Sequence, residues 1–315
     1  TPKNEEKNYV EKIWRLPDIT QCFTPPDFQV KINKLPALDN NFITFGCVNK
    51  LTKVNDDVIA LWSKILLSIS NSKLLLKNRD LDNQKVVNEI FARFEKHNVK
   101  KVVYAASASC YGLVKKFPTN EKTKIDPQYP YALSKYMGEL AALHWSKVYR
   151  LPVISIRIFN AYGTRSRTSG AYGAVMGVFL KQIIAKKPLT IVGNGKQKRD
   201  FLYASDVALA FYKACTTKHK GKIWNIGSNN PKSIKELVKI LEYKKNIKIP
   251  KRPGEPEITF ADTKKIKKDL KWKPKVTFKK GIKKILKNIE YWKNAPLWTP
   301  KKIEKKTKLW HKYVK

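Results

Sequence analysis

The sequence predicts an α/β protein with a doubly wound parallel sheet and a smaller α/β domain toward the C-terminus. Short apolar runs alternate with segments of helical period, which is the pattern of parallel strands joined by crossover helices. The chain has 315 residues, of which 42% are hydrophobic, so it can bury a sizeable core. It is well supplied with aromatic residues, which excludes a disordered protein.

The first part of the chain contains two strand–helix pairs followed by a third strand. Prolines break residues 1–41, which we expect to be irregular. Asn55, Asp56 and Asp57 provide N-cap chemistry for the first helix. We predict strands at 42–45, 73–77 and 101–106, the first of them buried, and helices at about 56–69 and 82–97.

After residue 106 the sequence continues to alternate between strand and helix patterns, and it contains no internal repeats and no low-complexity linker. Apolar residues at helical spacing predict six further helices, and short apolar runs predict four further strands. The helices are expected at about 131–149, 174–186, 205–216, 233–243, 279–293 and 301–313, and the strands at 152–158 and near 189–192, 222–226 and 257–260.

The composition limits the classes of partner. The formal net charge is +40, but lysines supply most of it, and no nucleic-acid-binding motif is present, so we expect no specific nucleic acid. A charge-driven, salt-sensitive affinity for polyanions stays an alternative. The four cysteines and four histidines show no metal-binding spacing, and the cysteine pattern favours a cytoplasmic location. No signal peptide or membrane-spanning run is recognisable.

Tyr131 and Lys135 form a Tyr-x-x-x-Lys pair that shares one face of the helix predicted at 131–149. A phenol has a pKa near 10, and a nearby ammonium group favours its ionised form, so the pair can act as a general acid/base. Ser107 and Ser109 follow the strand at 101–106 and could hold a substrate oxygen. Taken alone, the pair is better explained by an ordinary amphipathic helix with the tyrosine packed and the lysine solvated.

An ordered set of motifs surrounds this pair. The motifs lie at residues 103–112, 127–135, 157–163, 192–201 and 252–255. In this order the set resembles the extended short-chain dehydrogenase/reductase family, especially its UDP-glucose 4-epimerase-like members, from about residue 99 to the C-terminus. That resemblance implies a Rossmann-like sheet, NAD as cofactor and a UDP-sugar substrate.

The resemblance also implies roles for individual residues. Tyr131 would be the catalytic base, and Lys135 would be its partner and a nicotinamide-ribose contact. Ser107 would bind the sugar oxygen, with Ser109 beside it. The epimerase family oxidises carbon 4 of the sugar by hydride transfer to NAD and returns the hydride to the other face. No acidic pair lies near the strand at 101–106, which favours epimerase over dehydratase.

Three further residues are implied to bind the nucleotide sugar. Asn160 would hydrogen-bond it, and Arg199 and Arg252 would hold its diphosphate, a task that suits a bidentate guanidinium. Considered singly, each also fits a plainer interpretation: a turn residue at a strand end, a surface ion pair or a solvated loop charge. Family members often dimerise through the helices that correspond to about 131–149. The resemblance therefore implies a homodimer.

The glycine-rich turn that grips a dinucleotide is missing, because Gly46 is the only glycine before Gly112. Residues about 9–98 resemble instead part of the O-GlcNAc-transferase (SPINDLY-type) catalytic region, through residues 11–17, 42–53, 56–62 and 72–77. In that family the lysine matching Lys53 contacts a UDP diphosphate.

We therefore predict two regions, 1–98 and 99–315, with a seam near residues 97–100. The first region could rebuild the sheet beside the strand at 101–106. The alternative function is a non-catalytic UDP-sugar-binding chimera, or a fragment of a glycosyltransferase–epimerase fusion.

Overall fold

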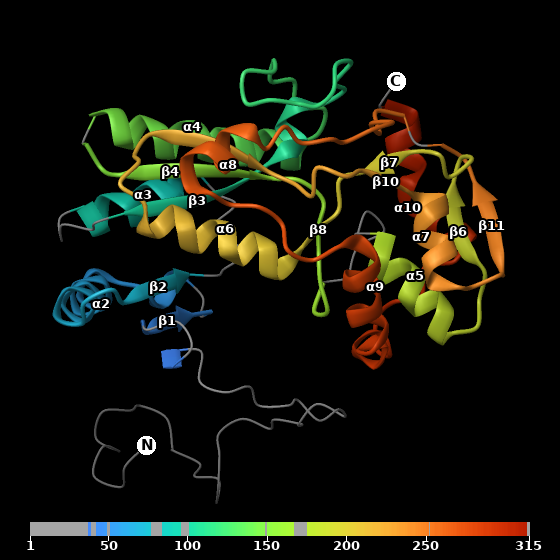
Figure 1. Ribbon diagram of the computed structural model, residues 1–315, viewed down its shortest axis with the longest axis horizontal. Coiled ribbons are helices and arrows are strands. Elements are labelled where there is room, and N and C mark those ends of the chain that lie inside the picture. Colours follow the sequence, from blue (N-terminus) through green and yellow to red (C-terminus); the bar gives the residue numbers. More distant parts are fainter. Residues whose placement is uncertain are drawn as a thin grey trace, which may run out of the picture. The chain divides into compact units, whose positions relative to one another are not determined.

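A computed structural model describes residues 37–38, 42–48, 51–76, 84–95, 101–148, 150–166, 175–251 and 253–313, and the structural statements below concern these residues. They belong to one compact unit, Leu35–Lys315 (Figure 1). The predicted boundary between residues 98 and 99 lies outside the described residues and stays a prediction.

The first elements are a strand–helix–strand–helix segment, as predicted. Helix α2 begins where expected, because the Asn55 side chain accepts a hydrogen bond from the Val58 amide at 2.9 Å. The Arg93 guanidinium donates to the Val54 carbonyl at 2.8 Å and ties the second helix to the start of the first. The bounds are β1 Thr44–Cys47, η2 Leu51–Lys53, α2 Asp56–Ser68, β2 Lys73–Leu76 and α3 Gln84–Glu95.

This segment does not extend the central sheet. Among the described strands, β1 and β2 pair in parallel with each other and form a sheet of their own. The Phe42 ring stacks on Tyr212 at a centroid distance of 5.3 Å, which holds the strand pair against a helix rather than at a sheet edge. The prediction of a buried first strand was also wrong: β1 alternates exposed and half-buried residues, because β2 is its one partner among the described strands.

The central sheet has the order β3-β4-β9 with all strands parallel: β3 is Val102–Ser107, β4 is Val153–Ile158 and β9 is Lys222–Ile226. Helices α4, Pro130–Val148, and α6, Ala204–Thr216, cover its two faces (Figure 1). Strand β4 is therefore buried on both sides, which agrees with its continuous apolar sequence. The carboxyl ends of β3 and β4 meet at one edge, where Ser107 and Asn160 lie.

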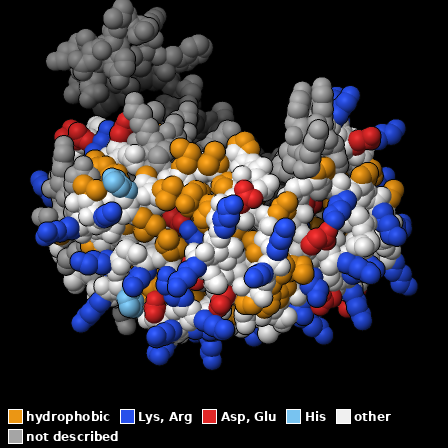
Figure 2. All heavy atoms as spheres, turned by 90° about the horizontal axis from the view of Figure 1, so that it is seen from above, with side chains coloured by type: hydrophobic (Ala, Val, Ile, Leu, Met, Phe, Trp, Pro, Cys, Tyr) orange, Lys and Arg blue, Asp and Glu red, His pale blue; other side chains and the backbone are white. Residues whose placement is uncertain are grey.

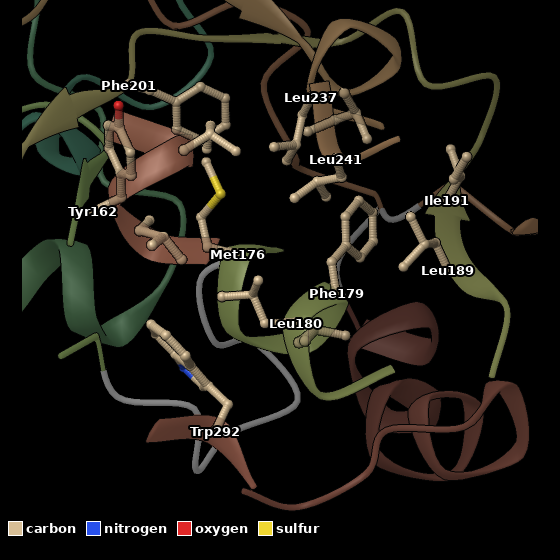
Figure 3. Close-up of a cluster of buried hydrophobic side chains, with 14 of the residues drawn as sticks. Tyr162, Met176, Phe179, Leu180, Leu189, Ile191, Phe201, Leu237, Leu241 and Trp292 are labelled. Carbon is tan, nitrogen blue, oxygen red and sulfur yellow. The ribbon is translucent and has the colours of Figure 1, made fainter. Parts of the chain in front are cut away.

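The C-terminal part packs a second core. Phe179, Leu189, Leu237 and Trp292 are almost fully buried in it and come from four different elements (Figure 3). The predicted helix at 279–293 is interrupted, because α9 ends at Leu286 and a 3₁₀ turn follows. The elements are α5 Val175–Ile184, β6 Leu189–Val192, α7 Ile234–Leu241, β11 Asn246–Ile249, α9 Phe278–Leu286, η5 Ile289–Trp292 and α10 Pro300–Tyr313.

Several elements differ from the prediction. β11 pairs in parallel with β6 but was not predicted, because its exposed, lysine-flanked sequence gives no strand signal. Helix α8, Lys264–Leu270, was also missed. The strand predicted at 257–260 does not form, and only an isolated bridge joins Ile258 to Lys198. Short strand pairs connect the loops, namely β5 Ala161–Tyr162 with β8 Leu202–Tyr203, and β7 Lys198–Arg199 with β10 Lys232–Ser233.

On the face shown in Figure 2, lysine and arginine side chains are spread over the described surface rather than gathered in one stripe. Cys47, Cys110 and Cys215 are free thiols, and no group of metal-binding residues occurs among the described side chains. Of the described helices, none combines the length and the apolar character that crossing a membrane requires. The cytoplasmic location and the lack of a specific nucleic-acid partner stay predictions.

Candidate functional site

The carboxyl end of β3 carries two serine hydroxyls in direct contact. Ser107 caps the 3₁₀ turn η4, Ala108–Tyr111, and its Oγ accepts the Ser109 amide at 3.2 Å. The Ser109 hydroxyl donates to the same Ser107 Oγ at 2.8 Å. Both residues are half-buried, so the predicted pair of hydroxyls is formed at the carboxyl end of β3.

Tyr131 and Lys135 lie in the first turns of α4, as predicted. The Tyr131 side chain is 51% exposed, so a substrate can reach its phenol. The Lys135 ammonium lies 5.8 Å from the centre of the Tyr104 ring, and the Tyr104 hydroxyl donates to the Lys135 carbonyl at 3.4 Å. Tyr104 fits beneath the helix because Gly138 has no side chain: a Cβ there would lie 2.0 Å from the Tyr104 hydroxyl oxygen.

A buried ion pair fixes α4 to the central sheet. Glu139 and Arg157 have side chains 1% and 4% exposed, and the guanidinium donates to both carboxylate oxygens at 2.5–3.1 Å. The Ser155 hydroxyl donates to the same carboxylate at 2.7 Å. The Arg157 guanidinium also donates to the Tyr111 hydroxyl at 2.8 Å, which links the helix to the turn after β3. The orientation of the helix that carries Tyr131 is therefore set by buried charge.

Tyr129 is a site residue that the sequence analysis did not assign. Its ring stacks on Tyr131 with centroids 6.4 Å apart and planes 10° apart. A hydrogen bond joins the hydroxyls of Tyr129 and Ser109, and burial raises the pKa of Tyr129. Arg199 and Glu255 are also among its electrostatic neighbours. The Tyr129 side chain thus connects the catalytic helix and the serines with the residues expected to bind the nucleotide.

Arg199 lines a cavity in the C-terminal part. Its side chain is 10% exposed, and its Nη2 lies 3.1 Å from Glu255 Oε1. Nη1 donates to the Lys198 carbonyl at 2.9 Å, so the guanidinium is held from two sides. The cavity has a volume of about 260 Å³ and is lined by Val192, Gly193, Asn194, Gln197, Arg199, Lys251, Glu255, Pro256 and Glu257.

Asn160 follows β4 and is exposed at the same sheet edge as the serines. Its side-chain oxygen accepts a hydrogen bond from the Thr259 hydroxyl at 2.6 Å, and its carbonyl accepts the Leu202 amide at 3.0 Å. The loop containing Thr259 therefore holds Asn160 in place. Arg252, Lys50 and the seam at residues 97–100 lie outside the described residues. The assignments of all the site residues stay predictions.

The residues present fit one end of a nicotinamide dinucleotide. Tyr131 and Lys135 share a face of α4 beside the serines, as the nicotinamide-ribose end requires. A glycine-rich dinucleotide turn has no counterpart among the described residues, because Gly46 is the one glycine that the sequence has before Gly112. β1, which precedes this loop, is not hydrogen-bonded to β3.

Comparison with known proteins places this chain in a family. Residues 63–285 match the family model described as GDP-mannose 4,6 dehydratase. The chain belongs to the extended short-chain dehydrogenase/reductases. A putative UDP-glucose 4-epimerase of Methanocaldococcus jannaschii is 33% identical over 203 residues, covering 62% of this chain and 65% of the relative. This chain thus spans slightly less than two thirds of the length of that member of the family.

Two further comparisons cover more of this chain. A UDP-glucuronate 4-epimerase of Thermodesulfobacterium geofontis is 28% identical over 293 residues, covering 90% of this chain and 85% of the relative. The solved UDP-glucuronic acid 4-epimerase of Bacillus cereus, in complex with UDP-glucuronic acid and NAD, is 26% identical with a TM-score of 0.62. That match covers 72% of this chain and 77% of the bacterial enzyme.

The fold itself is that of the epimerases. A UDP-glucose 4-epimerase from Thermotoga maritima superimposes with a TM-score of 0.66 over 82% of this chain and 93% of that enzyme, at 23% identity. The glycosyltransferase resemblance of residues 9–98 finds no support in these comparisons. The family model begins inside that segment, and the Thermodesulfobacterium alignment leaves only a tenth of the chain uncovered.

Proposed function

We propose that this protein is an NAD-dependent UDP-sugar 4-epimerase. The observation that carries the proposal is the meeting of two sets of residues at Tyr129. One set consists of the Ser107–Ser109 hydroxyls and the Tyr131–Lys135 pair, and the other of the Arg199–Glu255 pair at the edge of a cavity. The first set suits proton transfer at a sugar hydroxyl, and the second suits a diphosphate.

Tyr131 would act as the general acid/base. Its half-exposed side chain, as the phenolate, accepts the proton of the sugar hydroxyl at carbon 4 and returns it to the same oxygen when the hydride returns to the other face of the sugar. Lys135, one helical turn later, favours the ionised phenol through its positive charge. NAD, when bound, supplies the hydride acceptor and donor. The buried Glu139–Arg157 pair keeps the helix, and with it the phenol, in a fixed orientation.

Arg199 and Asn160 would anchor the nucleotide half of the substrate. A guanidinium matches a diphosphate in charge and geometry, and Arg199 is already fixed at the cavity edge by the Lys198 carbonyl. A diphosphate entering there competes with Glu255 for the same guanidinium. The substrate must therefore displace or share an existing ion pair, which favours ligands carrying two or more negative charges.

The test uses the purified full chain. Released nicotinamide cofactor is identified by mass spectrometry, and interconversion of UDP-glucose with UDP-galactose and of UDP-glucuronate with UDP-galacturonate is followed by chromatography. We expect turnover of at least one pair, and we expect Tyr131→Phe to lower kcat by roughly 10²-fold or more. Tyr212→Phe, which removes a hydroxyl on α6, is the matched control and should keep wild-type activity. Folded protein that neither contains the cofactor nor interconverts either pair refutes the proposal.

A homodimer is part of this proposal. Leu133, Met137 and Leu140 of α4 are 48–49% exposed at helical spacing, and form an apolar stripe on that helix. Such a stripe becomes buried if two copies pair through α4. Light scattering should give twice the chain mass of 36.4 kDa, and Met137→Lys should convert the protein to a monomer. A monomeric wild-type protein at assay concentration contradicts this part.

A second candidate is a non-catalytic UDP-sugar-binding protein. It is favoured by the lack of a glycine-rich turn in the sequence before Gly112 and by the β1–β2 sheet, which among the described strands stays separate from the central sheet. Calorimetry distinguishes the two: binding of UDP that persists in Tyr131→Phe, without turnover by wild-type protein, selects the binding function. A lack of UDP affinity excludes both candidates.

A further inference from the structure

The carboxamide of Asn160 is held at its oxygen by one hydroxyl group. The Thr259 hydroxyl oxygen lies 2.6 Å from Asn160 Oδ1, a separation typical of an O–H···O bond and shorter than the usual N–H···O bond. A carbonyl oxygen carries no proton, so Thr259 is the donor. The same hydroxyl accepts the Asp200 amide at 3.0 Å. Its single proton is therefore committed to Asn160.

The amino group of the Asn160 carboxamide is the part of the side chain that remains for a ligand. Asn160 is exposed just beyond the carboxyl end of β4, and none of the described residues accepts a hydrogen bond from its Nδ2. Because Thr259 binds the oxygen, the amino group lies on the other side of the carboxamide and keeps two N–H donors. A ligand that meets these donors must bring acceptor oxygens.

Thr259 also ties Asn160 to the stretch of chain that contains Arg199. The Asp200 amide donates to the Thr259 hydroxyl, and the Thr259 amide donates to the Lys198 carbonyl at 3.1 Å. Thr259 is thus bonded to the residues on either side of Arg199. Since Arg199 lines the cavity that we propose for the diphosphate, the Asn160 carboxamide is fixed to the same short stretch of backbone as that guanidinium.

We propose that Thr259 is a positioning residue that holds the Asn160 carboxamide with its amino group available to the diphosphate of the substrate. The inference rests on the proposed epimerase function and deepens it. An ionised diphosphate oxygen accepts hydrogen bonds and donates none, so it binds the amino group and is repelled by the carboxamide oxygen. A carboxamide free to rotate would present either end to the anion. Thr259 removes the unproductive orientation before the substrate arrives.

The experiment uses the full chain and compares wild type with Thr259→Val and Thr259→Ser. Valine has the shape of threonine but lacks the hydroxyl, whereas serine keeps it. Thr216→Val, at an exposed position in the last turn of α6, is the matched control. For each protein, kcat and KM for the sugar nucleotide, the calorimetric Kd of UDP and of uridine, and the melting temperature are measured.

The expected result is a loss of binding without a loss of chemistry. One hydrogen bond corresponds to a change of about two- to tenfold, so Thr259→Val should raise KM and the Kd of UDP by about that factor. The kcat should not change, because the contact is the same in the ground state and the transition state. The Kd of uridine, which lacks the diphosphate, should also stay the same. Thr259→Ser should restore the wild-type values.

Replacing Asn160 tests the direction of the carboxamide. Asn160→Asp still accepts the Thr259 proton but has no N–H group and adds a negative charge, so it should bind UDP more weakly than Asn160→Ala does. In the Asn160→Ala background, Thr259→Val should have no further effect on the Kd of UDP. Unchanged UDP affinity in Thr259→Val, an equal loss without the Asn160 carboxamide, or wild-type affinity in Asn160→Asp overturns the inference. Should Thr259→Val fail to fold, the two variants of the exposed Asn160 still decide.

Turnover and affinity distinguish this inference from the proposed function. Wild-type protein that binds UDP without interconverting either sugar pair refutes the epimerase function, and the UDP affinities of the variants then decide the role of Thr259. Wild-type protein without affinity for UDP overturns both.

Discussion

Replacing Glu139 by Gln removes one charge from a pair that is almost completely buried. The carboxylate accepts from the Arg157 Nε and Nη2 and from the Ser155 hydroxyl, at 2.5–3.1 Å. The amide keeps the size of the side chain but directs two N–H groups toward a guanidinium that cannot lose its proton. Breaking a buried pair in this way costs about 3–5 kcal/mol, because an uncompensated charge remains inside the protein.

Thermal or urea unfolding followed by circular dichroism measures this cost. In a chain of this size, each kcal/mol of lost stability lowers the melting temperature by roughly 2 °C. We therefore expect the melting temperature to fall by about 6–10 °C. Glu304→Gln removes an exposed carboxylate of α10 and should stay within about 0.5 kcal/mol of wild type. The double variant Glu139→Gln/Arg157→Gln should be less unstable than the sum of the two single variants. A single Glu139→Gln variant within 1 kcal/mol of wild type refutes the view that buried charge orients α4.

Two further predictions concern helices α4 and α7. Gly138→Ala should lower stability by about 1–3 kcal/mol, since its Cβ would overlap the Tyr104 hydroxyl, and Tyr104→Phe in the same chain should restore part of the loss in a melting experiment. Ser233→Ala should cost about 1 kcal/mol, because Ser233 and Glu236 form the capping box of α7. The backbone hydrogen bond from Ser233 lowers the pKa of Glu236. This stabilisation is therefore present above the ordinary carboxyl pKa of about 4.3 and is lost as the pH falls through the lowered value. Urea titrations between pH 3 and 7 should show the stability difference between wild type and Glu236→Gln shrinking at acid pH, whereas Ser233→Ala keeps the backbone amide that lowers this pKa.

Helices α2 and α4 and the sheet edge that carries Ser107 were predictable because their signals are local. Asn55 and the apolar period defined α2 to within one residue at its C-terminal end, and the apolar run before Ser107 defined β3. The positions of Ser107 and Tyr131 then followed from the strand end and the helix start. Spacing on one element specifies which side chains share a face, and parallel strands bring their carboxyl ends to one edge.

Features that depend on distant partners were not predictable. The sequence around Tyr129 shows an aromatic residue before a proline, and nothing local indicates that its hydroxyl meets Ser109, twenty residues earlier in the chain. The apolar run at 42–45 looked like a core strand, yet β1 has a single partner strand and remains partly exposed. Residues 257–260 have strand composition, but their backbone bridges Lys198 at only one position. Pairing between strands is decided by the whole fold.

Asp200 shows how the two halves of the site are held at a fixed separation. It follows Arg199 directly and is completely buried, and burial raises its pKa. Its carboxylate accepts the Ser228 amide and hydroxyl at 2.5–2.6 Å and the Ala261 amide at 2.9 Å. Ser228 lies just beyond the carboxyl end of β9 in the central sheet, whereas Arg199 belongs to the cavity in the C-terminal part. Because Asp200 is adjacent to Arg199 in the chain, its hydrogen bonds fix the backbone beside Arg199, which we propose to bind the diphosphate, to the sheet whose edge carries Ser107. A substrate that spans the cavity and the serines would therefore meet a site of preset length, and would not need to draw the two parts together on binding.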